Sequence, residues 1–138
     1  MNPIFVDTSA WMAIVDSGDV NHRPALSFQS ELPDTSHLIV ANYILDELYT
    51  LVLIDLGYRN ALDIKEKLDR MAEARILQVV WVDPTVSTAG WSVFERFNRD
   101  KQWSFTDCVS YAVMKRLGIT EVFSFDHHFE QTSFIRRP

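Results

Sequence analysis

The sequence predicts an α/β domain in which helices cover both faces of a central, mostly parallel sheet of four to five strands. Short apolar segments typical of buried strands alternate along the chain with longer amphipathic segments typical of helices. Each connection between parallel strands needs a crossover, which a helix supplies. The length of 138 residues suits one compact domain, so we expect a single domain over residues 1–138.

The first part of the chain contains two of the predicted strands. The apolar segment at 3–7 predicts a buried strand that ends on Asp7, and the hydroxyl residues after it favour a helix that stops by Gly18. A second helix is expected over about 20–32, before a turn-rich stretch. The apolar segment at 37–41 predicts the next buried strand.

The middle of the chain is mostly helical. Apolar residues recur with helical spacing over 42–56, and Gly57 closes that segment. The same pattern over 60–75 predicts an amphipathic helix with a solvated face. A strand at 76–82 follows, and an Asp-Pro pair then separates it from a helix over about 85–98.

The last part of the chain repeats the alternation. A helix is expected to begin around Asp107 and to end at Gly118, which is placed as a glycine cap. The segment at 121–125 predicts a strand followed by Asp126, and a short edge strand is expected near 134–135. There is no internal repeat or linker, which agrees with a single domain.

Composition narrows the class of protein. Hydrophobic residues make up 47% of the chain, enough for a substantial core. The formal net charge of −6 argues against a broad basic surface for nucleic acid, although acids that hold divalent cations would attract phosphate. The single cysteine, Cys108, the missing secretory signal and the absence of a long apolar run lead us to expect a cytoplasmic protein without a membrane segment.

Four carboxylates occupy positions that surface charge does not readily explain. They lie at the ends of two apolar strands and near the beginnings of two amphipathic helices, namely Asp7, Asp126, Glu47 and Asp107. In open parallel sheets, ligands bind beyond the carboxyl ends of the strands, so these side chains can meet at one rim. Close carboxylates repel each other, so such a group persists when a cation lies among them or when some of them stay protonated. Oxygen ligands favour Mg²⁺ or Mn²⁺. Such a site hydrolyses phosphodiesters.

Each acid also has a purely structural interpretation. Asp107 alone is better explained as a helix cap than as a ligand, and for Asp7 the two interpretations are balanced. Asp126 could open a turn, and Glu47 could be a solvated helix residue. The spacing of the acids alone therefore leaves two hypotheses, a metal site and a set of unrelated structural or surface acids.

Four segments together resemble the PIN-domain proteins, specifically the VapC-type toxins of bacterial toxin-antitoxin pairs. They occur in the family's order over nearly the whole chain and read FVDTSAW, NYILDELYTL, WSFTDCVSYAVM and GITEVFSFDHHF. Each segment alone is a weak signal, whereas four in sequence are specific. One departure is Ala41, where many relatives carry a hydroxyl residue that supports the site.

The resemblance implies a metal-dependent endoribonuclease. It assigns Asp7, Glu47 and Asp107 as ligands of Mg²⁺ or Mn²⁺ and Asp126 as a more variable fourth ligand. Supporting roles are implied for two further residues, Ser9 and Asp100, the second of which could also be only a loop residue. The implied partners are an RNA substrate, an antitoxin protein and a second copy of the chain in a homodimer.

The mechanism expected from this resemblance gives the acids different roles. The cation bound by Asp7 and Asp107 would polarise the scissile phosphate, and Glu47 or Asp126 would orient the attacking water. Transfer RNA, ribosomal RNA and messenger RNA all remain open as substrates. Two other hypotheses also remain: a catalytically degenerate binding protein on the same fold, and a phosphatase or DNA nuclease on a related scaffold.

Several other residues carry weaker expectations. Cys108 is expected to be a small buried residue, and Trp103 either stacks on a base or packs in the core. His127 and His128 are expected on an extended segment, pointing in opposite directions at the surface or a dimer contact. Basic residues near the motifs could meet the RNA backbone, although each has an ordinary surface role as its alternative; they are Arg96, Arg99, Lys101, Lys115 and Arg116.

Overall fold

The computed structural model describes residues 2–138 and contains one five-stranded sheet in the order β3-β2-β1-β4-β5. Every neighbouring pair of strands is parallel, which confirms the predicted α/β class. The strands are β1 (Pro3–Val6), β2 (His37–Ala41), β3 (Leu77–Val80), β4 (Glu121–Phe123) and β5 (Ile135–Arg137).

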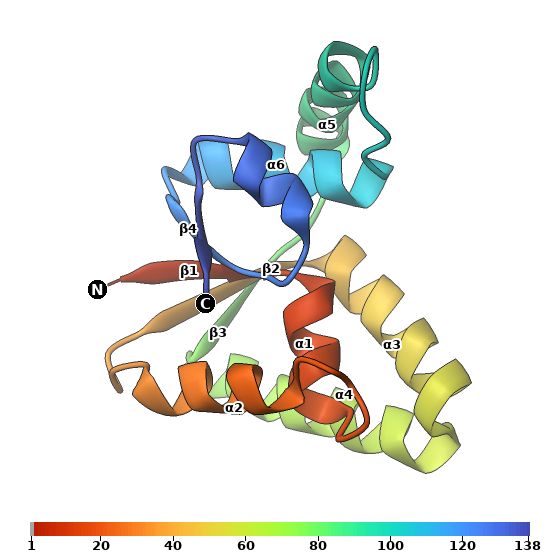
Figure 1. Ribbon diagram of the computed structural model, residues 1–138, viewed down its shortest axis with the longest axis vertical. Coiled ribbons are helices and arrows are strands. Elements are labelled where there is room, and N and C mark those ends of the chain that lie inside the picture. The colour runs from red at the N-terminus through yellow and green to blue at the C-terminus, as the bar shows by residue number, and fades with distance from the viewer. Residues whose placement is uncertain (1) are drawn as a thin grey trace.

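Helices cover both faces of this sheet, so the molecule has three layers (Figure 1). The helices are α1 (Thr8–Val15), α2 (His22–Glu31), α3 (Asn42–Leu56), α4 (Tyr58–Glu73), α5 (Pro84–Phe97) and α6 (Phe105–Leu117), with a short 3-10 helix, η1 (His127–Gln131). Helices α1 to α4 lie on one side of the strands, and α5, α6 and η1 lie on the other. Within residues 2–138, none of the helices has the length and apolar character needed to span a bilayer.

The core lies between the layers along the central strands. Phe5, Val40 and Val122 are fully buried there, because both faces of a parallel sheet are covered. A second, smaller apolar cluster joins α5 to α6 and consists of Val93, Trp103, Cys108 and Ala112. The expected burial of Cys108 is confirmed, and Trp103 takes the core role of its two alternatives, with 4% of its surface exposed.

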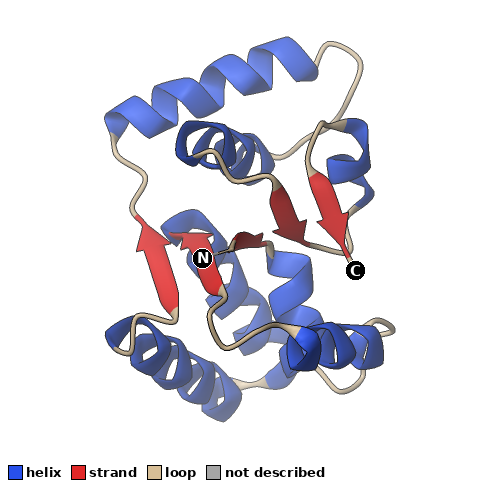
Figure 2. Ribbon diagram, turned by 90° about the vertical axis from the view of Figure 1, so that its left-hand side faces the viewer, coloured by secondary structure: helices blue, strands red, loops and turns tan. Residues whose placement is uncertain are grey.

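The strand order reverses direction beside β1. The chain runs outward from β1 through β2 to β3, and β4 and β5 are then added on the other side of β1. The register pairs Val6 with Phe123, so β1 and β4 end side by side. Figure 2 shows the strands between the two helical layers from a second direction. This reversal is the position where open parallel sheets bind ligands. Asp7 directly follows β1, and Asp126 lies three residues after the end of β4.

Two helix boundaries match the sequence prediction closely. Helix α3 ends at Leu56 before Gly57, which has a φ of 92°, and α6 ends before Gly118, which has a φ of 68° in the left-handed region. Both positions favour glycine because a Cβ would be strained there. Helix α6 is capped at its N-terminus by Ser104, whose hydroxyl accepts a hydrogen bond from the Asp107 N–H at 3.0 Å. Asp107 is therefore not the cap of its helix.

The prediction for the paired histidines was wrong. His127 and His128 begin η1 and do not lie on an extended segment. The physical reason is local, since the Asp126 carboxylate accepts a hydrogen bond from the His128 N–H at 2.9 Å and so starts a helical turn directly after β4. The turn leaves His127 exposed and directs the His128 ring toward Asp107.

Candidate active site

Asp7 lies at the junction of β1 and β4 and is only 4% exposed. Its N–H donates to the carbonyl of Phe123 at 3.0 Å, which extends the pairing of the two strands by one residue. Its Oδ2 atom accepts hydrogen bonds from the hydroxyls of Ser9 and Ser124, each at 2.9 Å. Within residues 2–138 these are the side-chain hydrogen bonds of Asp7, so Oδ1 is available to a ligand.

The same two serines hold the loop after β4 against β1. Ser9 accepts a hydrogen bond from the Phe125 N–H and Ser124 accepts one from the Asp126 N–H, both at 3.0 Å. The two hydroxyl oxygens are 3.1 Å apart. Ser9 therefore contacts Asp7, as the family resemblance implies for a supporting residue, and the position of Asp126 depends on the same hydroxyl pair.

Asp107, Asp126 and His128 form a second part of the site. Nδ1 of His128 lies 3.0 Å from Oδ2 of Asp107 and 3.3 Å from Oδ1 of Asp126. One ligand atom from each of the three residues lies within 4.8 Å of the others, and in the described part of the chain no other set of three or more potential ligands does so. Two oxygens and one nitrogen thus converge from α6 and from the turn after β4.

The three aspartates influence one another's ionisation. Burial is the main cause that raises the pKa of Asp7 to about 6; the negative charge of Asp107 and, to a lesser extent, that of Asp126 raise it further, whereas the two serine hydroxyls oppose the shift. Burial and then the charge of Asp126 also raise the pKa of Asp107, and His128 opposes that shift. Because these carboxylates repel one another when ionised, a cation among them would be strongly stabilised.

Glu47 lies near this group but outside it. It is half-buried on α3 and lines a hollow of about 430 Å³ together with Phe105 and Thr106, the residues that precede Asp107 in α6. No hydrogen bond or ion pair joins Glu47 to the three aspartates within residues 2–138. Glu47 thus faces the start of α6, and its role as a metal ligand stays a prediction.

Asp100 is not brought to the cluster. It lies in the loop between α5 and α6, its side chain is 76% exposed, and it pairs with the neighbouring Lys101 at 3.3 Å. In the described part of the molecule it makes no hydrogen bond or ion pair with another predicted site residue. Its surroundings are those of an ordinary loop residue.

Ser124 and His128 are site residues that the sequence prediction missed. Ser124 is a fully buried polar side chain directly after an apolar strand, and a buried polar group needs a partner, so the position itself was a usable signal. His128 follows Asp126 by two residues. This spacing indicates a site residue only when the helical turn that brings the His128 ring to Asp107 is known. Trp103 stacks on the His128 ring with centroids 5.8 Å apart and so limits its orientation.

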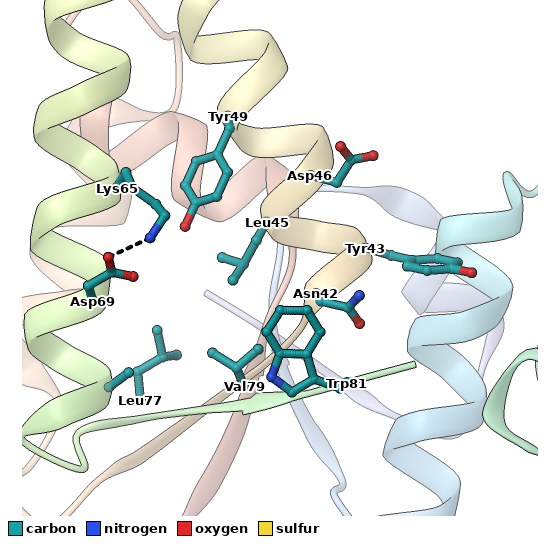
Figure 3. Close-up of a pocket in the computed structure, with 11 residues that line it drawn as sticks. Asn42, Tyr43, Leu45, Asp46, Tyr49, Lys65, Asp69, Leu77, Val79 and Trp81 are labelled. Atoms are coloured by element: carbon teal, nitrogen blue, oxygen red, sulfur yellow. Dashed lines mark hydrogen bonds and ion pairs between the residues drawn. The ribbon is translucent and has the colours of Figure 1, made fainter. Parts of the chain in front are cut away.

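A larger cavity lies apart from the aspartates. Figure 3 shows this space of about 760 Å³ between α3, α4 and β3, where Trp81, Tyr49 and the Lys65–Asp69 pair face one another. None of the predicted site acids lines it. It shares Tyr43 and Asp46 with the hollow that contains Glu47. Its apolar walls do not supply the chemistry that the aspartate cluster offers.

The donor set of the cluster fits a divalent cation. Asp7, Asp107 and Asp126 offer carboxylate oxygens, the ligands preferred by Mg²⁺ and Mn²⁺, and His128 adds an imidazole nitrogen that Mn²⁺ accepts more readily than Mg²⁺. The raised pKa values of Asp7 and Asp107 also favour a cation at this position. Repulsion between the carboxylates causes part of each pKa shift, and a cation would relieve that repulsion. This chemistry suits hydrolysis of a phosphate ester.

Comparison with known proteins places these features in a family. The family description "PIN domain" matches residues 4–135. The 23S rRNA-specific endonuclease VapC20 of Mycobacterium tuberculosis is 29% identical over 132 residues, which cover 96% of this chain and 95% of that protein. A VapC ribonuclease of Archaeoglobus fulgidus is 27% identical over 126 residues, which cover 90% of this chain and 77% of that protein.

Solved structures agree with the sequence comparison. The crystal structure of Mycobacterium tuberculosis VapC20, described as a sarcin-ricin loop cleaving toxin, has a TM-score of 0.85 at 29% identity and covers 98% of this chain and 99% of that chain. VapBC2 of Rickettsia felis, solved with a promoter DNA fragment, has a TM-score of 0.70 at 11% identity and covers 98% and 97% of the two chains. The second likeness is one of fold.

Proposed function

The chain belongs to the PIN-domain family, and from this premise we propose that it is a metal-dependent endoribonuclease of the VapC type, the toxin of a toxin-antitoxin pair. The observation that carries the proposal is the close approach of Asp107, Asp126 and His128 beside the buried Asp7, at the point where the strand order reverses. The acids after β1, in α6 and in the turn after β4 repel one another when ionised, and a bound cation would offset that repulsion.

The proposed roles follow from the contacts of each residue. Asp7, Asp107 and Asp126 would hold Mg²⁺ or Mn²⁺, which when bound supplies a Lewis acid at the scissile phosphate. Ser9 and Ser124 keep Oδ2 of Asp7 occupied and so direct Oδ1 toward the ligand. Glu47, at the edge of the cluster, would orient the attacking water. Asp100 retains only the supporting role implied by the family resemblance.

The substrate proposal is ribosomal RNA. Transfer RNA and messenger RNA have no specific support. A relative that aligns with 96% of this chain is named for 23S rRNA. We therefore take a loop of large-subunit ribosomal RNA as the substrate and treat transfer and messenger RNA as alternatives that the same experiment distinguishes. Mn²⁺ or Mg²⁺ is the proposed cofactor.

The proposed partners are an antitoxin protein and a second copy of the chain. The support for an antitoxin is the fold shared with the toxin-antitoxin proteins VapBC of Rickettsia felis and of Salmonella typhimurium. A homodimer and a single domain over residues 1–138 remain predictions. Light scattering of the purified chain tests the first, and a single cooperative unfolding transition supports the second.

The function is tested by incubating the purified chain with total RNA and Mn²⁺ or Mg²⁺ and sequencing the new RNA ends. We expect a small number of cleavage sites in 23S rRNA that disappear with EDTA and in the Asp7→Asn variant. Asp34→Asn, which changes an exposed acid, is the matched control and should cleave normally. Cleavage that persists in Asp7→Asn contradicts the site assignment.

The same experiment separates the competing functions. Binding of RNA without any cleavage would favour a degenerate binding protein on this fold. Equal cleavage of DNA, or hydrolysis of a small phosphate ester, would favour the nuclease or phosphatase alternatives. The presence of all four predicted acids, Asp7, Glu47, Asp107 and Asp126, favours an enzyme over a degenerate binding protein.

A further inference from the structure

The positive charge of the molecule is concentrated in the layer formed by α5 and α6. Residues 84–118 contain five Lys and Arg residues against three Asp and Glu, although the whole chain contains 13 against 19. This layer therefore has a net positive charge in an acidic protein. It is also the layer that carries Asp107 at the start of α6.

Three of these cations line one groove. The groove lies between α5 and α6, has a volume of about 730 Å³ and contains Arg96, Lys115 and Arg116 beside the ring of Tyr111. A neighbouring hollow of about 400 Å³ shares Arg96 and adds Arg99. Glu95 is the one acid that lines either space, so the two together present four cations against one carboxylate.

These cations have no carboxylate partner. Within residues 2–138, no Asp or Glu oxygen lies within 4.0 Å of Arg96, Arg99, Lys115 or Arg116. The same holds for Arg23, Arg59, Lys67 and Arg75, but these four do not line the groove. Aromatic rings hold two of the groove cations in place. Arg96 lies 4.7 Å from the Phe97 ring, and Lys115 lies 5.4 Å and 5.8 Å from the rings of Phe134 and Tyr111.

The groove is connected to the acidic cluster along one face of α6. Asp107, Tyr111 and Lys115 are spaced four residues apart, so they share that face over about 12 Å. Tyr111 also packs against Trp103 at 6.1 Å, and Trp103 stacks on His128. A ligand that follows this face from the aspartates therefore arrives at Lys115 and Arg116.

We propose that the groove between α5 and α6 binds backbone phosphates of the RNA substrate on one side of the scissile bond. This inference rests on the proposed function and adds to it a substrate-binding surface away from the reacting phosphate. Unpaired cations beside aromatic rings are the combination that binds single-stranded nucleic acid without reading its sequence. The continuity with the aspartates along α6 favours RNA over an acidic protein segment as the occupant.

The test measures RNA affinity in the Asp7→Asn background, where the probe is not cleaved. The groove variant replaces three cations, as Arg96→Gln, Lys115→Gln and Arg116→Gln. The matched control removes three exposed cations from α2 and α4, as Arg23→Gln, Arg59→Gln and Lys67→Gln, and so changes the net charge equally. The probe is a fluorescein-labelled stem-loop of 23S rRNA, and its anisotropy is followed at several salt concentrations without metal.

We expect the groove variant to bind the probe at least about tenfold more weakly, with a salt dependence reduced by about 2 in log-log slope, because about three phosphate contacts are lost. The control should bind as the parent does. Equal affinity of the groove variant and the control overturns the proposal. Unchanged RNA affinity with weakened binding of polyglutamate would instead assign the groove to an acidic protein segment.

Kinetics separates this proposal from the proposed function. With Asp7 intact, the groove substitutions should raise KM for a long RNA and leave kcat unchanged, because they remove binding that substrate and transition state share. A dinucleotide that contains only the scissile phosphate has no further phosphate to place in the groove, so both variants should cleave it equally. If the unaltered chain cleaves no RNA, the proposed function fails, and the anisotropy comparison still decides the role of the groove.

Discussion

At the scale of single residues, the decisive feature is a buried carboxyl group that shares its surroundings with two other acids. Asp7 is 4% exposed, and its pKa is raised to about 6, first by burial and then by Asp107. Only two serine hydroxyls favour its charged form. Ionised Asp7 therefore costs free energy in the metal-free protein, which a bound cation would offset.

The first prediction concerns the stability of the metal-free protein. Because the folded-state pKa of Asp7 is about 6 and its ordinary value is 3.8, the folded state binds an extra proton between these values. The free energy of unfolding should thus fall as pH rises from about 4 to about 6, by up to about 3 kcal/mol. Urea unfolding in EDTA measures this. Asp7→Asn should flatten the slope, and an unchanged slope contradicts the account.

The second prediction concerns Ser124. Ser124→Ala removes one hydrogen bond to Asp7 and leaves the Asp126 N–H without its acceptor, which should cost about 1–3 kcal/mol in the free energy of unfolding. It should also raise the pKa of Asp7 further, so that stabilisation by Mn²⁺ begins at a higher pH. Thermal melts over a pH series check both effects.

Ser110 provides the control for this substitution. It is also fully buried, but its hydroxyl has no hydrogen-bond partner among the described residues. Ser110→Ala should therefore leave stability and the pH dependence unchanged or slightly improved. If both serine variants behave alike, the contact of Ser124 with Asp7 has no role.

The third prediction concerns the two histidines. His128 lowers the pKa of Asp107 and contacts Asp126, whereas His127 is 82% exposed and pairs with Glu130. His128→Gln should weaken Mn²⁺ binding about 10–100-fold, as expected for a residue that ligates the metal or orients its ligands. Calorimetric titration measures the affinity. His127→Gln should bind Mn²⁺ normally, and equal losses in both variants would argue against a specific role for His128.

The candidate residues divide into those that sequence can and cannot predict. Asp7 and Asp126 follow apolar strands, and parallel strands end at one edge, so their position was predictable. The contact between Ser124 and Asp7 joins residues 117 positions apart and requires β1 and β4 to be neighbours. No local pattern specifies that neighbour relation.

At the scale of elements, helices α5 and α6 approach each other at a glycine. A Cβ atom on Gly90 would lie 2.8 Å from Cγ2 and 3.3 Å from Cα of Val109. Both distances are too short for an ordinary contact, and the second involves backbone, which does not move easily. The close approach of the helices thus requires glycine at this position.

The fourth prediction follows from this contact. Gly90→Ala should lower the free energy of unfolding by about 1–3 kcal/mol through overpacking, against a gain of up to about 1 kcal/mol from helix propensity. Chemical denaturation measures the difference. Thr88→Ala, at an exposed position in the same helix, should be neutral or stabilising. A Gly90→Ala protein more stable than the parent would show that the helices can separate without cost.

Element boundaries were predictable where a local signal specified them. The strand at 37–41 and the helix over 42–56 match β2 and α3 because an apolar run and a following glycine define them. Helix α2 is shorter than predicted, beginning at His22. The 3-10 helix η1 was missed because it depends on a side-chain cap from Asp126, which periodicity does not reveal.

At the scale of the whole molecule, strand order and charge distribution act together. The order β3-β2-β1-β4-β5 brings two strand ends and the start of α6 to one rim, and the α5–α6 layer adds cations beside it. The α/β class and the parallel sheet were predictable from the alternation of elements. The concentration of positive charge in the α5–α6 layer could not be predicted, because the net charge of −6 is a sum over the whole chain.

Anomalous diffraction from crystals soaked in Mn²⁺ shows whether Asp7, Asp107 and Asp126 together hold a divalent cation. We expect an anomalous peak at the cluster, about 2 Å from oxygens of at least two of these aspartates. We also expect this peak to be lost in Asp107→Asn crystals. A fully soaked crystal with no peak at the cluster, or with its strongest peak at another site, would contradict a metal site at these aspartates.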